Sequence, residues 1–349
     1  MGEAGVAERG GGMPRVAVVG AGRWGRNHVR NYAEIGALAA IVDRHAGRAE
    51  EIALAHAVPA LTFDEALADL SIDAFVFALP PSQNVPLGLR ALEAGKHLFV
   101  EKPLALSTRD GETLCRAADR LGRRLMVGHI LQYHPAFTAL VHLVRAGGLG
   151  RILSITSTRL DLGRVRREED AMWALAPHDV SMILALVEAA PIRVSASGGF
   201  HTHPEIADTT SLELLFPGGL RAEIRSSWLH PTKEQRLAVV GSDAMAVFDD
   251  REPWPAKLLL HRYELIESGA SPVLHRHDPV PVAVQEGEPL RAECLHFLHS
   301  IRTGARPLTD GWEGVRVLDV LERASAALAS TDAVPPAGAS ARPARAGAA

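Results

Sequence analysis

Three glycines, Gly20, Gly22 and Gly25, follow a short apolar run and stand in the spacing G-x-G-x-x-G. After a buried strand this spacing suits a tight turn that opens a helix. The first glycine permits the turn, the second lets a ligand approach the backbone, and the third lets helix and strand pack closely. A helix start also presents main-chain N–H groups and a positive dipole end, which favour a pyrophosphate. The pattern therefore predicts a dinucleotide-binding turn made of Gly20, Ala21, Gly22, Arg23, Trp24 and Gly25. A glycine turn in an α/β fold that binds no nucleotide is the alternative.

A carboxylate ends the next apolar run. Asp43 lies 18 residues after Gly25, at the end of residues 38–43. At this place a carboxylate binds the hydroxyls of the adenosine ribose, and its charge repels a 2′-phosphate. Asp43 therefore favours NAD as the cofactor. The next residue, Arg44, is able to hold a 2′-phosphate, so NADP stays open as the alternative.

The order of apolar and amphipathic segments changes once along the chain. Up to about residue 130, almost wholly apolar strands alternate with amphipathic helices, which predicts a parallel sheet covered on both faces. These strands are expected at residues 15–20, 38–43, 74–80, 96–103 and 124–130, and the helices at 23–35, 46–57, 84–95 and 107–122. From about residue 151, strands follow one another and alternate in polarity, which predicts an antiparallel sheet with one open or partner-covered face. These are expected at 151–160, 193–201, 209–216, 220–229, 234–241 and 245–250, with a hairpin turn at 217–219 and helices near 172–189, 288–303 and 311–328.

The fold class that follows is α/β. An N-terminal doubly wound parallel sheet of the Rossmann type precedes a C-terminal α+β domain with a large open antiparallel sheet. We place the nucleotide-binding domain at residues 14–133 and the domain for substrate and oligomer contacts at residues 134–330. Residues 1–13 and 331–349 are poor in large apolar side chains, so both ends are expected to be disordered.

Charge balance and cysteine content exclude several functions. The 349 residues include 37 Lys and Arg and 41 Asp and Glu, a net charge of −4. That balance argues against a nucleic-acid partner, which needs clustered positive charge. Two cysteines, Cys115 and Cys294, are too few for a disulfide framework, so a cytoplasmic location is expected. No apolar run approaches the roughly 18 residues of a membrane span. The His and Cys spacings match no metal site.

Several short motifs together resemble one enzyme family. The third strand ends in Ala78-Leu79-Pro80-Pro81 and the fourth in Glu101-Lys102-Pro103, and matching blocks follow at residues 128–137, 174–179 and 293–311. With the glycine turn and Asp43, they resemble the glucose–fructose oxidoreductase / inositol dehydrogenase / MocA (Gfo/Idh/MocA) family over about residues 15–328. The resemblance implies a dehydrogenase that moves a hydride between nicotinamide and a secondary hydroxyl of a sugar or cyclitol. It also implies cofactor contacts at Leu79, Pro80, Pro81, Asn84, Glu101 and Lys102.

Lys102 and His178 match the residues that react in this family. Lys102 follows a parallel strand at its carboxyl end, where open α/β sheets bind ligands, and its ammonium group is expected to hold the reacting oxygen. The resemblance implies that His178 is the general base, a role that suits a side chain titrating near neutral pH. It also implies a cis peptide bond before Pro103. The alternatives are a surface lysine and a packing histidine.

The chain departs from the family pattern at Ala174. Many relatives have Asp there, one helical turn before the histidine that matches His178. In those relatives the resemblance implies that the carboxylate orients the imidazole and raises its pKa, so His178 is expected to lack that support. The departure keeps open a hypothesis of another class, a non-catalytic sensor that binds NAD and a sugar nucleotide.

A narrower resemblance concerns the substrate. Residues 158–184 and 227–250 resemble the subgroup that oxidises C3 of UDP-N-acetylglucosamine-type sugar nucleotides, which implies a role in amino-sugar or antibiotic-sugar biosynthesis. An inositol or aminocyclitol dehydrogenase is the alternative within the family. A non-redox reaction that uses tightly held NAD, such as glycoside cleavage through a transient ketone, is a further one.

Polar and cationic residues after the first domain are the candidate substrate contacts. An aromatic and polar cluster covers a sugar face and binds its hydroxyls, and guanidinium groups match a diphosphate. The candidates are Gln132, Tyr133, His134, Arg159, Arg164 and Asp179, with Arg166 beside them. A domain-junction loop and a solvated charge run are the corresponding alternatives.

One face of the second sheet is expected to join copies of the chain. Its side chains are too mixed for a core and suit a polar contact between sheets, so a homodimer or homotetramer is expected. The face carries Thr209, Ser211, Glu213, Leu215, Arg221, Glu223 and Arg225.

Overall fold

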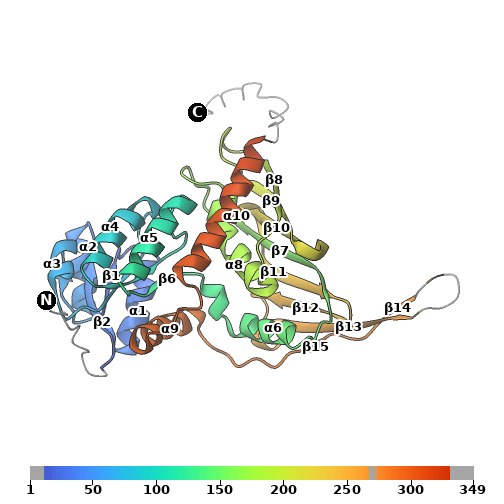
Figure 1. Ribbon diagram of the computed structural model, residues 1–349, viewed down its shortest axis with the longest axis horizontal. Coiled ribbons are helices and arrows are strands. Elements are labelled where there is room, and N and C mark those ends of the chain that lie inside the picture. The colour runs from blue at the N-terminus through green and yellow to red at the C-terminus, as the bar shows by residue number, and fades with distance from the viewer. Residues whose placement is uncertain (1–11, 267–270, 272, 331–349) are drawn as a thin grey trace, which may run out of the picture.

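The computed structural model describes residues 12–266, 271 and 273–330, which form two sheets with helices packed on them (Figure 1). The ends that were predicted to be disordered, residues 1–13 and 331–349, lie outside the described residues apart from Gly12 and Met13.

The first sheet has six strands in the order β3-β2-β1-β4-β5-β6, and its strand pairs are parallel. Its strands are β1 (Val16–Val19), β2 (Leu38–Val42), β3 (Ala60–Leu61), β4 (Ala74–Phe77), β5 (His97–Val100) and β6 (Leu125–Val127). Every residue of β1 and β4 is buried, because helices cover both faces. The helices between the strands are α1 (Gly25–Ile35), α2 (Ala46–Ala55), α3 (Phe63–Ala68), α4 (Asn84–Glu93) and α5 (Thr108–Arg120). The predicted Rossmann-type sheet is therefore confirmed.

The second sheet has nine strands in the order β14-β13-β12-β11-β7-β10-β9-β8, with β15 beside β13. Its strands are β7 (Ile152–Leu162), β8 (Arg193–Gly199), β9 (Thr209–Leu215), β10 (Arg221–Ser227), β11 (Leu229–Gly241), β12 (Ala244–Asp249), β13 (Leu258–Ile266), β14 (Val273–Arg276) and β15 (Val280–Pro281). One pair corrects the expectation of a wholly antiparallel sheet: β10 runs parallel to β7. Two helices and two strands separate β7 from β10 in the sequence, so no hairpin fixes their relative direction.

The β9–β10 hairpin confirms the predicted turn. Pro217–Gly219 form a single 3₁₀ turn, in which Gly218 has φ 79° and Gly219 has φ 85°. Positive φ at both positions is the conformation that glycine adopts without a steric cost. The turn sets the register, in which Ala222 and Ile224 face the core while Glu223 and Arg225 are exposed.

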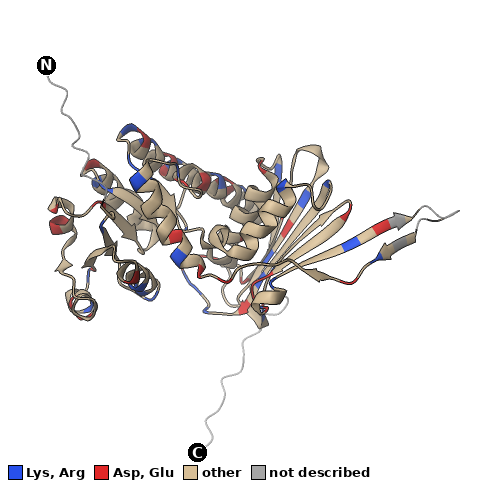
Figure 2. Ribbon diagram, turned by 90° about the horizontal axis from the view of Figure 1, so that it is seen from below, with Lys and Arg blue, Asp and Glu red and all other residues tan. Residues whose placement is uncertain are grey.

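Helices cover one face of the second sheet. They are α6 (Pro135–Arg145), α7 (Ala171–Leu175) and α8 (Pro177–Val187). Figure 2 shows these helices on one side of the fanned strands, and basic and acidic residues distributed along the strands themselves. The sequence patterns left out α3, α6, β3 and β13 to β15, since a strand of two residues such as β3 is too short to show a period.

The two C-terminal helices join the two halves of the molecule. α9 (Pro289–Thr303) packs on α1 of the first domain, and α10 (Gly311–Ser330) packs on both α5 and α8 (Figure 1). The carboxyl ends of β5 and β6 therefore lie next to the second domain, and it is at these ends that an open parallel sheet binds its ligands.

Candidate functional site

The glycine turn has the shape that a pyrophosphate needs. A Cβ on Gly20 would lie 2.4 Å from the Ala78 carbonyl oxygen, and one on Gly25 would lie 1.8 Å from the Gly20 carbonyl oxygen. A Cβ on Gly22 would meet no described atom within 4 Å, so this side of the turn is open. α1 starts at Gly25 with Trp24 as its N-cap residue, and within the described chain no side chain caps it. The positive end of the helix dipole thus favours an anion at this turn, and the residues present fit a dinucleotide.

Asp43 lies at the end of β2 and is tied to this turn. Its side chain is only 4% exposed. One carboxylate oxygen accepts the main-chain N–H of Ala21 at 2.8 Å, and the other accepts that of His45 at 2.9 Å. Arg48 lies 3.4 Å from the first oxygen, while Arg44 is exposed. Asp43 therefore holds the turn in place, and its contact with a ribose stays a prediction.

Glu101 connects the end of β5 to α1. Its carboxylate accepts the indole N–H of Trp24 and lies 2.6 Å from His28 Nε2. A Cβ on Gly128 would lie 2.9 Å from the second oxygen of Glu101, so glycine at 128 leaves room for this carboxylate. The sequence patterns missed His28, although its place one helical turn after the glycine turn was a usable signal.

The loop after β5 is fixed by Asn84, the first residue of α4. Asn84 is buried, and its Nδ2 donates to the carbonyl oxygens of Pro103 (3.1 Å) and Leu104 (3.3 Å). The Lys102–Pro103 peptide bond is cis, as the resemblance implied. Leu79, Pro80 and Pro81 lie at the end of β4, half-buried or exposed. Asn84 acts on Lys102 through this loop, and the cofactor contacts predicted for these four residues stay predictions.

Lys102 reaches from the first domain to the second. Its Nζ donates to the main-chain carbonyl oxygen of Ala174 at 2.8 Å. Burial lowers the pKa of Lys102 to about 8; the charges of Arg166 and Arg159 add to this effect, and the Glu101 carboxylate opposes it. Lys102 is therefore cationic at pH 7 and able to stabilise a developing alkoxide.

His178 lies in the first turn of α8, on the other side of the same region. Burial lowers its pKa well below the ordinary value, and the charges of Lys102 and Arg159 lower it further. The imidazole is consequently neutral at pH 7 and able to accept a proton. Its Nδ1 is buried and has no hydrogen-bond partner among the described residues.

Ala174 contributes to the site through its backbone. Its methyl group is 3% exposed and packs with Ala171 and Trp228, while its carbonyl oxygen holds Lys102. The main chain at 174 thus orients the ammonium group of Lys102, whereas the imidazole of His178 is left without a carboxylate from this position.

The arginines of β7 and the loop after it occupy two different environments. Arg159 is buried and forms a bidentate pair with Asp179, with Nε–Oδ2 at 2.7 Å and Nη2–Oδ1 at 3.0 Å. Arg164 is exposed, and Arg166 forms an ion pair with Glu169. Burial and the charge of Arg164 lower the pKa of Arg166. Positive charge therefore gathers on the side of Lys102 that faces this loop.

Gln132, Tyr133 and His134 are buried at the junction of the two domains. Gln132 Nε2 donates to Ser181 Oγ at 2.8 Å, and Tyr133 Oη lies 2.9 Å from Thr309 Oγ1. His134 accepts a main-chain N–H at the start of α6 and lies 3.2 Å from Asp250. The structure places these three polar groups against protein partners, and their contact with a substrate stays a prediction.

A pair that the sequence patterns missed lies beside His178. His129 follows β6, and its Nδ1 lies 2.5 Å from Glu313 Oε2 of α10. The His129 and His178 rings are 6.4 Å apart between centroids and nearly perpendicular, at 81°. His129 stands inside the block 128–137 that carried the resemblance, but no sequence signal connects it to a residue 184 positions later.

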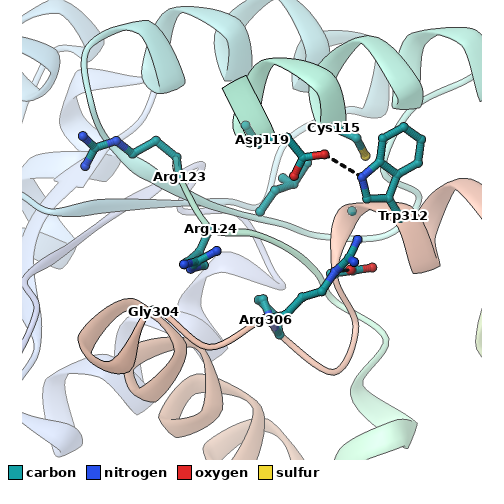
Figure 3. Close-up of a pocket in the computed structure, with 12 residues that line it drawn as sticks. Cys115, Asp119, Arg123, Arg124, Gly304, Arg306 and Trp312 are labelled. Carbon is teal, nitrogen blue, oxygen red and sulfur yellow. Dashed lines mark hydrogen bonds and ion pairs between the residues drawn. The ribbon is translucent and has the colours of Figure 1, made fainter. Parts of the chain in front are cut away.

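A separate cavity of about 250 Å³ lies between α5, β6 and the start of α10 (Figure 3). Arg306 is paired with Asp310, and the indole of Trp312 donates to Asp119 at 2.8 Å. Arg123 and Arg124 also line the cavity, and the predicted site residues lie elsewhere.

In the described part of the chain, we find neither a group of His, Cys, Asp and Glu side chains suited to a metal nor a helix able to span a membrane.

Comparisons with known proteins match the whole folded chain. Two family models match it, one described as an oxidoreductase family with an NAD-binding Rossmann fold at residues 14–129, the other as the GFO/IDH/MocA C-terminal domain at residues 137–247. The UDP-N-acetylglucosamine 3-dehydrogenase of Acidithiobacillus ferrooxidans is 29% identical over 312 residues, which are 87% of this chain and 94% of the relative. A solved structure of that enzyme has a TM-score of 0.80 at 27% identity and covers 90% of this chain and 97% of its own. The scyllo-inositol 2-dehydrogenase (NAD(+)) of Bacillus subtilis is 25% identical over 323 residues, 88% of this chain and 91% of the relative.

Proposed function

The chain belongs to the Gfo/Idh/MocA family of NAD(P)-dependent dehydrogenases of sugars and inositols, and from this premise we propose that it oxidises C3 of a UDP-N-acetylglucosamine-type sugar nucleotide with NAD. The relative named UDP-N-acetylglucosamine 3-dehydrogenase, which aligns over most of both chains, supports this substrate. We place the reaction in amino-sugar or antibiotic-sugar biosynthesis, where a 3-keto sugar is the substrate for amination.

Lys102 and His178 divide the chemistry between them. Lys102 is cationic and, held by the Ala174 carbonyl, binds the reacting oxygen and favours its alkoxide form. His178 is neutral and takes the hydroxyl proton. The glycine turn of Gly20, Gly22 and Gly25 would hold NAD, which would supply the hydride acceptor. Glu101 joins the end of β5 to Trp24 of this turn, and Asn84 joins the loop after Lys102 to the start of α4.

The observation that favours a sugar nucleotide as the substrate is the positive charge beside Lys102. Arg164 and Arg166 lie close enough for the charge of one to lower the pKa of the other, and Arg166 also acts on Lys102. Like charges held together in this way favour an anion, and guanidinium groups match a diphosphate in geometry. An uncharged inositol offers no counter-charge to Arg164, whereas Arg166 already pairs with Glu169.

An inositol dehydrogenase is the second candidate. The scyllo-inositol 2-dehydrogenase also aligns over most of its length, and Lys102 with His178 suits either alcohol. The two candidates differ in whether Arg164 and Arg166 contribute to substrate binding.

The test is turnover with NAD and a panel of UDP-N-acetylhexosamines and inositols, followed by the absorbance of reduced nicotinamide. We expect turnover of a UDP-N-acetylhexosamine. In Arg164→Gln/Arg166→Gln its KM should rise about tenfold or more, since each lost charge-assisted contact contributes roughly 1.5–3 kcal/mol. Turnover of inositols alone would replace this proposal with the second candidate. Binding of NAD and the sugar nucleotide without turnover would indicate the sensor.

A further inference from the structure

As a general base, His178 must be held in one of its two neutral tautomers by the groups around it. A neutral imidazole that accepts a proton on Nε2 carries its own hydrogen on Nδ1. That Nδ1 is buried, and among the described residues it has no hydrogen-bond partner. Relatives with a carboxylate at the position of Ala174 have an acceptor nearby, whereas here the methyl group of Ala174 packs with Ala171 and Trp228.

Two cations act on the pKa of His178, Lys102 from the end of β5 and Arg159 from β7, and the ring of His129, from the end of β6, lies beside the imidazole. Lysine and arginine cations only donate hydrogen bonds. His129 alone among the three has a lone pair to offer to an N–H of His178.

Glu313 decides which nitrogen of His129 offers that lone pair. Its Oε2 lies 2.5 Å from His129 Nδ1, and the two side chains are 5% and 2% exposed. The other carboxylate oxygen accepts Ser181 Oγ at 2.7 Å and Gln132 Nε2 at 3.2 Å, so the carboxylate is fixed in orientation. Because an ionised carboxylate accepts only, His129 donates from Nδ1, and in its neutral form it leaves Nε2 as an acceptor.

The two imidazoles are placed for a bridged contact. Their centroids are 6.4 Å apart with the rings nearly perpendicular, a separation that one water molecule spans. Glu313 thus contacts His129, and the ring of His129 neighbours that of the base, which connects a buried carboxylate to His178.

We propose that His129, fixed by Glu313, is a positioning residue that holds His178 in the Nδ1–H tautomer and so leaves Nε2 free to take the substrate proton. This rests on the proposed function, in which His178 is the general base. The pair replaces, from β6 and α10, the carboxylate that position 174 does not supply.

The test compares Glu313→Gln and His129→Phe with Ser181→Ala. Ser181 donates to the same carboxylate but to its other oxygen, so this control loosens Glu313 without breaking its contact with His129. ¹⁵N NMR of histidine-labelled protein reports the tautomer of His178, assigned by the signal lost in His178→Asn. NAD binding and the thermal midpoint check that each variant is folded.

We expect a single Nδ1–H tautomer for His178 in the unmodified protein and in Ser181→Ala, and a mixture in both other variants. For the sugar that is turned over, kcat should fall about tenfold, part of the roughly 10²–10⁴ that general-base catalysis contributes. KM should stay within about twofold, because the substrate contacts are untouched. An unchanged tautomer together with an unchanged kcat in both variants would overturn the inference. If no alcohol is oxidised, the proposed function fails, and the tautomer measurement still decides the role of His129.

Discussion

At the scale of single residues, the same burial gives Lys102 and His178 opposite protonation states. Burial disfavours the charged form of both, which lowers the pKa of Lys102 to about 8 and takes that of His178 well below its usual range. At neutral pH one is still a cation and the other is already neutral. This is the combination that alcohol oxidation needs, an electrophilic donor beside a free base.

The pH dependence of oxidation should follow from these two groups. The kcat/KM of the free enzyme should rise at a pH below 6.5, where His178 loses its proton, and fall near pH 8, where Lys102 loses its own. The direction of each limb of the pH profile follows because the base must be neutral and Lys102 must be charged for the reaction. A pH–rate profile of the oxidation checks this. A rate that stays level through pH 8 and above would show that the charge of Lys102 is not required.

Lys102→Ala should lower kcat by about 10²–10³, since one stabiliser of developing negative charge commonly contributes that much. NAD affinity should stay within a few-fold, because the glycine turn and Asp43 are untouched. Steady-state kinetics and NAD titration measure both. Lys233→Ala, a half-exposed lysine near Asp161, serves as the control and should behave like the unmodified protein. Near-normal turnover in Lys102→Ala would remove the lysine from the mechanism.

The unmodified protein should bind NAD more tightly than NADP, and Asp43→Ser should relax this preference. The carboxylate repels a 2′-phosphate, and exposed Arg44 is then available to hold it. Because Asp43 also fixes Ala21, its loss should weaken NAD binding as well. Titrations with both cofactors decide the matter. A lower dissociation constant for NADP than for NAD in the unmodified protein would contradict the prediction.

The sequence predicted those side chains of the site that belong to local motifs and missed those that meet only through the fold. Lys102 and His178 each stand in a short matching block. His28 contacts Glu101 across 73 residues and His129 contacts Glu313 across 184. The position of His28 after the glycine turn marks it as a candidate residue, but no sequence spacing predicts the partner of either histidine. Gln132, Tyr133 and His134 were predicted to contact the substrate, with a domain-junction loop as the alternative, and the structure buries all three at the junction of the two domains.

At the scale of elements, the site depends on where strands end and short helices begin. Lys102 and His129 follow the neighbouring parallel strands β5 and β6, while His178 lies in the first turn of α8. Strand–helix alternation was enough to predict the parallel sheet, since its strands other than β3 are almost wholly buried. The parallel pairing of β7 with β10 was not predictable in the same way. The alternation of polar and apolar residues indicates which face of the sheet each side chain lies on, but it does not indicate which strand is the neighbour.

A charge added at the junction of α7 and α8 should change the pKa values of Lys102 and His178. Ala174→Asp places a carboxylate on the residue whose carbonyl binds Lys102 and one turn before His178. A negative charge within about 4–6 Å favours the protonated form of both groups, so both limbs of the pH–rate profile should move to higher pH. Profiles of the two proteins, measured side by side, test this. Unmoved limbs would show that a side chain at 174 turns towards Trp228 instead of the site.

At the scale of the whole molecule, α9 and α10 tie the second sheet to the first domain, and no helix among the described residues covers the far face of that sheet (Figure 2). Along β9 and β10, Leu212, Leu214, Ala222 and Ile224 are buried, whereas Ser211, Glu223 and Arg225 lie on the opposite face. Arg221 and Glu213 pair across the hairpin on this face. The core needs one face only, which leaves the other available for a second copy.

The chain should be a dimer or a tetramer at micromolar concentration. The open face is polar along β9 and β10, and a second copy of the same face complements its mixed charges. Light scattering after size exclusion measures the mass. Glu223→Arg should weaken the assembly by adding like charge beside Arg225 and Arg221, whereas Glu51→Arg, on the exposed side of α2, should leave it intact. A monomer in the unmodified protein would rule this interface out.

The most direct test of the central claim is the transfer of a labelled hydrogen. UDP-N-acetylglucosamine that carries deuterium at C3 should react with NAD to give reduced cofactor that is one mass unit heavier, and His178→Asn should abolish this transfer while NAD still binds. Mass spectrometry of the cofactor measures the label. Reduced cofactor without deuterium would place the oxidation at another carbon, and labelled cofactor formed at an undiminished rate by His178→Asn would contradict the assignment of the base.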